Sequence, residues 1–92
     1  MENLMVKEGQ YLAVFQSTHR VLKAEAHLKS IGLPILLIPA PRALQTDCGL
    51  AIRFDDEIKQ ALLAALAEQD TSPAFICRLE NGIYITQETE IA

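Results

Sequence analysis

Residues 11–19, Tyr11-Leu12-Ala13-Val14-Phe15-Gln16-Ser17-Thr18-His19, join a short apolar run to the start of a helix. The run is entered through Gly9, and its five apolar side chains predict a buried strand. Ser17 and Thr18 then offer side-chain oxygens to the free amides of a helix that begins near His19. The chain therefore opens with a strand followed directly by a helix.

The helix is predicted to continue to Gly32. Apolar residues recur at three- and four-residue steps and predict its inward face, namely Val21, Leu22, Ala24, Leu28 and Ile31. His27 is expected to be solvated surface. Gly32 suits a left-handed helix end, and Pro34 prevents the helix from continuing.

The next apolar run, residues 34–39, is bounded by a proline at each end. Its continuous apolar character predicts a central strand buried on both faces. Prolines in Pro39-Ala40-Pro41-Arg42 then take the chain out of the sheet, because proline donates no ladder hydrogen bond. A loop is expected up to Asp47, followed by a strand over residues 49–54.

The second half repeats the pattern of helix and strand. Asp55 or Asp56 is expected to cap a helix, whose predicted inward residues are Ile58, Leu62, Ala65 and Leu66. Strands over 74–79 and 83–86 flank Asn81-Gly82, a strong hairpin signal. The order predicts an α+β fold, a ferredoxin-like split βαβ sandwich with two helices on one face of a mainly antiparallel sheet and a C-terminal hairpin strand.

Length and composition bound the class of protein. With 92 residues, of which 50% are hydrophobic, a single domain over 1–92 is expected, with a core at about 10–86 and frayed ends. The net charge of −4 and the scattered basic residues argue against nucleic-acid binding. No apolar run is long enough for a membrane span, and no signal peptide is recognised. A cytoplasmic location is expected, where Cys48 and Cys77 would stay reduced and unpaired.

Cys48 is the principal candidate for chemistry. It lies in a polar connection between two apolar runs, and Gly49 has no side chain to shield it. Arg42 and the helix start at Ser17, Thr18 and His19 are candidate partners for an anionic sulfur, whereas the charge of Asp47 opposes one. Cys48 equally fits a small buried residue at the start of a strand, and Cys77 lies in an apolar run where packing is the expected role.

No metal site and no cofactor are predicted. The two histidines and Cys48 lack a recognisable zinc spacing, and the chain has no phosphate-binding loop or serine–histidine elbow. Arg42 follows Pro41 on a stiff turn, where a guanidinium suits a planar anion. An alternative role is therefore a small-anion-binding or dimeric interaction module that uses Ser17, Thr18, His19 and Arg42, with Cys48 only a packing residue.

Three separated clusters resemble the small bacterial family of putative selenium/sulfur carrier protein-like domains. They are residues 15–19 with Ala24-Glu25, then residues 39–42, then Asp47-Cys48-Gly49-Leu50-Ala51-Ile52-Arg53-Phe54. The resemblance implies a cytoplasmic bacterial protein that carries sulfur or selenium on Cys48. Our leading hypothesis from it is a non-enzymatic carrier that accepts the atom from a donor protein, holds it on Cys48 as a persulfide or selenopersulfide, and passes it to an acceptor protein. It maps the family's Ser-Thr-His cluster onto Ser17, Thr18 and His19, and its proline-arginine turn onto Pro39, Pro41 and Arg42. The Cys-Pro-x-Pro motif of other small sulfur-relay carriers is absent.

Overall fold

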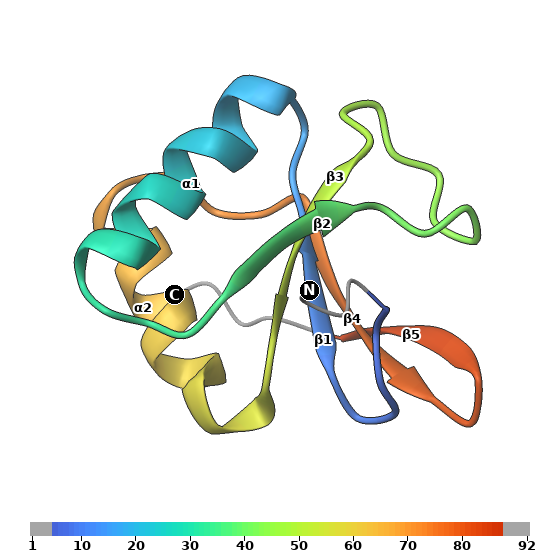
Figure 1. The fold of residues 1–92 in the computed structure, drawn as a ribbon. Helices are drawn as coiled ribbons and strands as arrows, with labels where there is room; N and C mark the ends of the chain where they lie inside the picture. Colours follow the sequence, from blue (N-terminus) through green and yellow to red (C-terminus); the bar gives the residue numbers. More distant parts are fainter. Residues whose placement is uncertain (1–4, 88–92) are drawn as a thin grey trace.

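The computed structural model describes residues 5–87 and shows two helices on one face of a five-stranded antiparallel sheet (Figure 1). The strands and helices, in chain order, are β1 (Tyr11–Val14), α1 (Thr18–Ser30), β2 (Leu36–Pro39), β3 (Leu50–Phe54), a 3₁₀ turn (Asp56–Ile58), α2 (Lys59–Glu68), β4 (Phe75–Glu80) and β5 (Ile83–Gln87). The predicted α+β class and element order are confirmed.

The strands lie in the order β2-β3-β1-β4-β5, and every neighbouring pair is antiparallel. Because β3 lies between β1 and β2, the first strand–helix–strand unit is split, as the sequence predicted. The prediction that residues 34–39 form a central strand is wrong, since β2 is an edge strand. Its apolar character has another cause: Leu37 packs toward the helices, whereas Leu36 and Ile38 pack on the opposite face beside Leu44 of the following loop.

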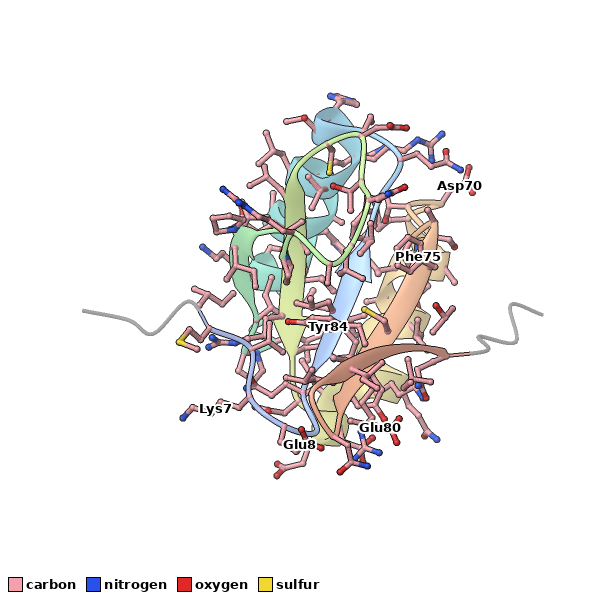
Figure 2. The ribbon with its side chains drawn as sticks, turned by 90° about the vertical axis from the view of Figure 1, so that its right-hand side faces the viewer. Lys7, Glu8, Asp70, Phe75, Glu80 and Tyr84 are labelled. Carbon is pink, nitrogen blue, oxygen red and sulfur yellow. The ribbon has the colours of Figure 1, made fainter. Side chains whose placement is uncertain are left out.

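Side chains alternate between the two faces of the sheet and build two apolar clusters. The helix-side core contains the aromatic residues Tyr11, Phe15 and Phe54 together with α1 and α2. The opposite face carries a smaller cluster of five buried residues, Leu12, Val14, Ile38, Ala51 and Cys77. Figure 2 looks onto this opposite face, and the labelled Phe75 and Tyr84 pack against it.

Helix α1 begins and ends as its sequence predicted, but its inward face is narrower. The Ser17 hydroxyl accepts a hydrogen bond from the Arg20 amide at 3.2 Å, and Gly32 adopts a φ of +81°. Val21, Ala24 and Leu28 are buried, whereas Leu22 and Ile31 are 44% and 50% exposed. The predicted inward positions of these last two residues are wrong, because α1 covers the sheet with one stripe only.

His27 also departs from its predicted position on solvated surface. The residue is half-buried, and its Nε2 atom is buried without a hydrogen-bond partner among residues 5–87. It lies next to the buried position Leu28 on a helix whose inward stripe is only three residues long. The sequence pattern therefore did not predict that His27, a polar residue, is partly buried on this side of α1.

The second half follows the sequence closely. Leu62, Ala65 and Leu66 of α2 are buried as predicted, and Ile58, in the preceding 3₁₀ turn, packs against the core while only partly buried. The predicted cap by Asp55 or Asp56 is wrong, because Asp55 makes no side-chain capping bond and the Asp56 carboxylate accepts a hydrogen bond from the Tyr11 hydroxyl at 2.8 Å. Asn81 and Gly82 have φ values of +53° and +77° and close the β4–β5 hairpin. The fraying predicted for the two ends concerns residues that lie largely outside the described part of the chain.

Candidate functional site

The segments that carry the predicted site residues meet at one end of the sheet (Figure 1). Strand β1 ends at Val14, which pairs with Ala51 near the start of β3. The chain therefore leaves β1 toward Ser17 at the same end of the sheet at which it enters β3 from Cys48. Pro39, the last residue of β2, pairs with Leu50 at the same end. The start of α1 and the loop over residues 40–49 therefore lie at the same end of the sheet, which we call the Cys48 end.

Cys48 is half-buried and packs against the helix-side core. Its Sγ atom lies 3.4 Å from the Leu50 amide, which donates to it, and 3.2 Å from the Leu50 carbonyl, to which the thiol donates. The sulfur is thus held by the backbone two residues ahead, in a residue that is itself half-buried. An anionic sulfur species accepts hydrogen bonds, and an amide N–H can donate one to it.

Backbone hydrogen bonds fix the loop around Cys48. The Gly49 amide donates to Thr46 Oγ1 at 2.9 Å, and the Gly49 carbonyl accepts from the Ala40 amide at 2.9 Å. Gly49 has a φ of +70°, a left-handed conformation that glycine adopts without strain. A Cβ atom added there would meet nothing within 4 Å, so conformation and not space requires the glycine.

Ser17, Thr18 and His19 form the start of α1. Ser17 uses its hydroxyl as the helix cap, whereas Thr18 and His19 are exposed. His19 lines a surface pocket of about 270 Å³ with two further basic residues of α1, and the lining residues are His19, Arg20, Lys23, Asp70 and Thr71. The imidazole therefore faces a largely basic hollow whose only carboxylate among these residues is Asp70.

Arg42 and Asp47 are both exposed on the loop. The Leu44 amide donates to the Pro41 carbonyl at 3.0 Å and closes the turn that carries Arg42. Within residues 5–87, neither side chain takes part in a hydrogen bond or an ion pair, and none joins Cys48 to His19 or Arg42. The fold gathers the segments at one end, and direct partnership of these side chains with the sulfur stays a prediction.

Cys77 lies in a different environment from Cys48. It is 1% exposed on the face of the sheet opposite the helices, whereas Cys48 packs on the helix side. Burial raises the pKa of the Cys77 thiol from 9.0 to about 11, and a hydrogen bond with the Leu12 backbone offsets part of this rise. The two cysteines are free, and the sheet separates them.

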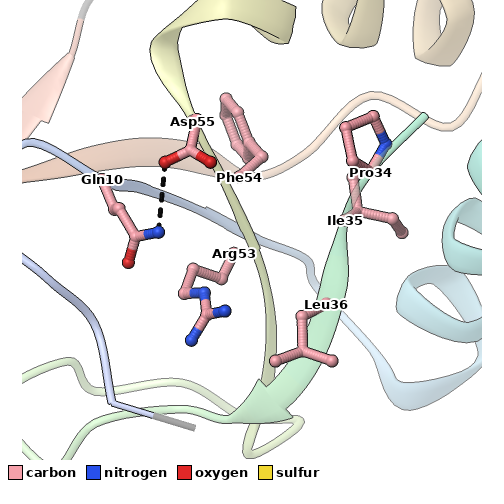
Figure 3. A pocket seen from close by; sticks show the side chains of 7 residues that line it. All are labelled: Gln10, Pro34, Ile35, Leu36, Arg53, Phe54 and Asp55. Atoms are coloured by element: carbon pink, nitrogen blue, oxygen red, sulfur yellow. Dashed lines mark hydrogen bonds between the residues drawn. The ribbon is translucent and has the colours of Figure 1, made fainter. Parts of the chain in front are cut away.

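A second pocket, of about 250 Å³, lies at the opposite end of β3 (Figure 3). Its polar residues are Gln10, Arg53 and Asp55, and the Gln10 amide donates to Asp55 at 3.1 Å. Arg53 donates to the Met5 carbonyl at 3.0 Å. None of the residues predicted for the site lines this pocket.

Comparison with known families identifies the chain. The family model described as Putative Se/S carrier protein-like matches residues 10–78, which include every predicted site residue. The chain belongs to this family. Neither a curated protein nor a solved structure matches it.

The family assignment confirms the resemblance seen in the sequence, and the description of the family suggests a carrier of sulfur or selenium. Membership of a carrier family also implies protein partners. Along residues 5–87, none of the helices has the length and apolar character that crossing a bilayer requires. In the same range, His, Cys, Asp and Glu side chains form no group of three or more that could bind a metal ion.

Several site features escaped the sequence analysis. The hydrogen bonds between Cys48 Sγ and Leu50 depend on loop backbone conformation, for which the sequence offers only Gly49 as a signal. Thr46 was not singled out, although a threonine three residues before a glycine is a common acceptor in a turn. Arg20 and Lys23 follow His19 on α1, and only the fold places Asp70 and Thr71 beside them.

Proposed function

We propose that this cytoplasmic protein carries sulfur or selenium on Cys48 as a persulfide or selenopersulfide, without being an enzyme. The observation that carries the proposal is the position of Cys48, half-buried in a fixed loop of the segment that matches the carrier family, with the Leu50 amide directed at its sulfur. Cys77, the other cysteine, is closed off by burial and by a raised pKa.

Loading would proceed by thiol exchange with a donor protein that bears a persulfide. The Cys48 thiolate attacks the terminal sulfur of the donor, a new S–S bond forms, and the donor's own S–S bond breaks. The donor leaves as a thiolate, and Cys48 gains one sulfur atom without net oxidation or reduction. The acceptor protein takes the atom in the same way, and selenium in place of the outer sulfur follows the same path.

The Cys48 end supports this chemistry in three ways. The Leu50 amide donates to the sulfur, and the first turn of α1 lies at the same end of the sheet. His19 and Arg42, both exposed, supply positive or hydrogen-donating groups for the outer atom, while Asp47 opposes accumulation of negative charge. Gly49 leaves space beside Cys48 for the approach of a partner.

Loading by a cysteine desulfurase with cysteine as its substrate tests the proposal. Intact mass should show one added sulfur on the wild-type chain and on Cys77→Ala, and none on Cys48→Ala. A reducing thiol should remove the added atom. If the Cys48→Ala variant gains sulfur as readily as the wild type, Cys48 is not the carrier residue.

A second candidate function, a small-anion-binding module, is favoured by the pocket of His19, Arg20 and Lys23. The Ser17 hydroxyl is already used as a helix cap, and Asp70 lines the same pocket, so the site offers a mixed rather than a purely cationic lining. In this function Cys48 is a packing residue, and its thiol should react with iodoacetamide only after denaturant is added. Alkylation of the folded protein separates the two functions.

A further inference from the structure

Within residues 5–87, strand β5 is an edge of the sheet, and its own sequence lacks the charged residues and prolines that usually protect an edge. It is the last strand in the order β2-β3-β1-β4-β5, and its sequence Ile83-Tyr84-Ile85-Thr86-Gln87 contains no charge and no proline. Ile83 and Ile85 are 61% and 43% exposed. Proteins usually protect edge strands with charged residues, prolines or covering segments. The other edge, β2, follows this rule in that it ends in Pro39.

The hairpin fixes which backbone groups of β5 point outward. Its two-residue turn has positive φ at Asn81 and Gly82, and Glu80 pairs with Ile83 across it. In such a hairpin the closing pair is hydrogen-bonded and the pairs then alternate. Ile83, Ile85 and Gln87 therefore bond to β4, whereas the amides and carbonyls of Tyr84 and Thr86 face away from the sheet.

Contacts with the N-terminal segment hold this hairpin in place. The Glu8 carboxylate accepts hydrogen bonds from the Asn81 amide and, at 3.4 Å, from the Gly82 amide. Figure 2 shows Glu8 beside the turn, with Glu80 and Tyr84 on the two strands. Because the turn is anchored, β5 is presented as a formed strand, and pairing along it carries little additional ordering cost.

We propose that β5 pairs with β5 of a second copy of this chain, in an antiparallel arrangement with its two-fold axis at Ile85. The outward groups dictate this register, because Tyr84 then pairs with Thr86 of the second copy and Thr86 pairs with Tyr84. The same patch meets itself, as a two-fold interface requires. The product is a continuous ten-stranded sheet, since each copy contributes five strands.

Charges on neighbouring strands are compatible with this pairing. In the proposed register Ile85 faces Ile85 across the axis, and Ile83 faces Gln87. The nearest charged residues on the same rows, Arg78 beside Ile85 and Glu80 beside Ile83, lie one strand back on β4. Like charges directly opposite one another destabilise a strand pair, and none are opposed here.

The interface is small, so the dimer is weak. It consists of one short strand from each copy, well below the area of a stable interface. We therefore expect dissociation in the micromolar range or above, and a dimer that forms as concentration rises. The pairing leaves the Cys48 end free, because β3 lies three places from β5 in the sheet order.

Sedimentation velocity of the full chain, from low-micromolar to millimolar concentration, tests the proposal. Wild-type protein should shift from monomer to dimer. Ile85→Lys places two ammonium groups across the axis and should weaken association by about tenfold or more. Ile31→Lys, an equally exposed isoleucine at the end of α1, is the matched control and should dimerise as the wild type does.

Thr86→Pro supplies a second variant that is independent of side-chain charge. Its ring removes only an outward amide, so the hairpin keeps its own hydrogen bonds while the dimer loses two donors, one from each copy. Circular dichroism should show that both β5 variants remain folded. A wild-type chain that stays monomeric at millimolar concentration, or a dimer that Ile85→Lys and Thr86→Pro leave intact, overturns the proposal. Either result leaves sulfur loading of Cys48 unaffected.

Discussion

Selective alkylation of the folded protein is the sharpest test of how differently the chain holds its two cysteines. Iodoacetamide reacts with the thiolate and not with the thiol. The pKa of Cys77 is raised from 9.0 to about 11. At pH 8 its thiolate fraction therefore falls from about one tenth to about one thousandth. Reaction at Cys77 is expected to be about a hundredfold slower than at an ordinary cysteine, before its 1% exposure is considered.

Cys48 is less enclosed than Cys77, because it is half-buried on a loop, and in residues 5–87 its sulfur hydrogen-bonds to the backbone of Leu50. A time course of intact mass at pH 8 should show a single label on the wild-type chain. Cys77→Ala should take up its label at the wild-type rate. Cys48→Ala should remain unlabelled until denaturant is added.

Two results would refute the reasoning. Rapid labelling of folded Cys48→Ala would show that burial does not protect Cys77. A wild-type chain that needs denaturant for its first label would show that Cys48 is a packing residue, and the carrier proposal would lose its basis. Urea titration of each variant, followed by circular dichroism, confirms that labelling was measured on folded protein.

Two substitutions at the Cys48 end test the local geometry by urea unfolding. Ser17→Ala removes the cap of α1 and should lower stability by about 1 kcal/mol, whereas Thr18→Ala, at the next and exposed position, should change it little. If the two variants lower the free energy of unfolding equally, the hydrogen bond of the Ser17 cap makes no specific contribution to stability. Gly49→Ala should cost about 1–2 kcal/mol because of the φ of +70°, and Gly49→Asn should cost less, since asparagine tolerates this conformation. A clash with neighbours, which the open space at Gly49 excludes, would instead make the larger asparagine worse.

The sequence predicted the elements whose signals are local. Ser17 before α1, Gly32 after it and Asn81-Gly82 in the hairpin each act through their own backbone conformation, and all three were predicted correctly. The position of β2 in the sheet is not determined by local signals. Its apolar run indicated contacts on both faces, and both faces are in contact, since Leu37 packs toward the helices and Leu36 and Ile38 pack with Leu44 of the 40–49 loop. Contacts on the two faces do not reveal whether a strand has a neighbour on each side, so an edge strand can have the same pattern as a central strand.

The candidate site shows the same division. Cys48 and Gly49 could be identified because a cysteine before a glycine in a polar connection is conspicuous in an apolar chain. The bonds from Sγ to Leu50 and the grouping of His19 with Asp70 depend on how separate segments meet. His27 is a further example, since the burial of its Nε2 atom could not be predicted from the spacing of apolar residues along α1.

The environment of the Cys48 sulfur is set by a loop, whereas that of Cys77 is set by a strand. In β4 the alternation of side chains decides that Cys77 points into an apolar cluster, and only a change of register would release it. Cys48 precedes β3 and is exempt from this alternation, so the left-handed turn at Gly49 and the Thr46 hydroxyl decide its orientation. Loop substitutions should therefore change access to the Cys48 thiol while the core stays packed, and substitutions in β4 should change Cys77 only together with stability.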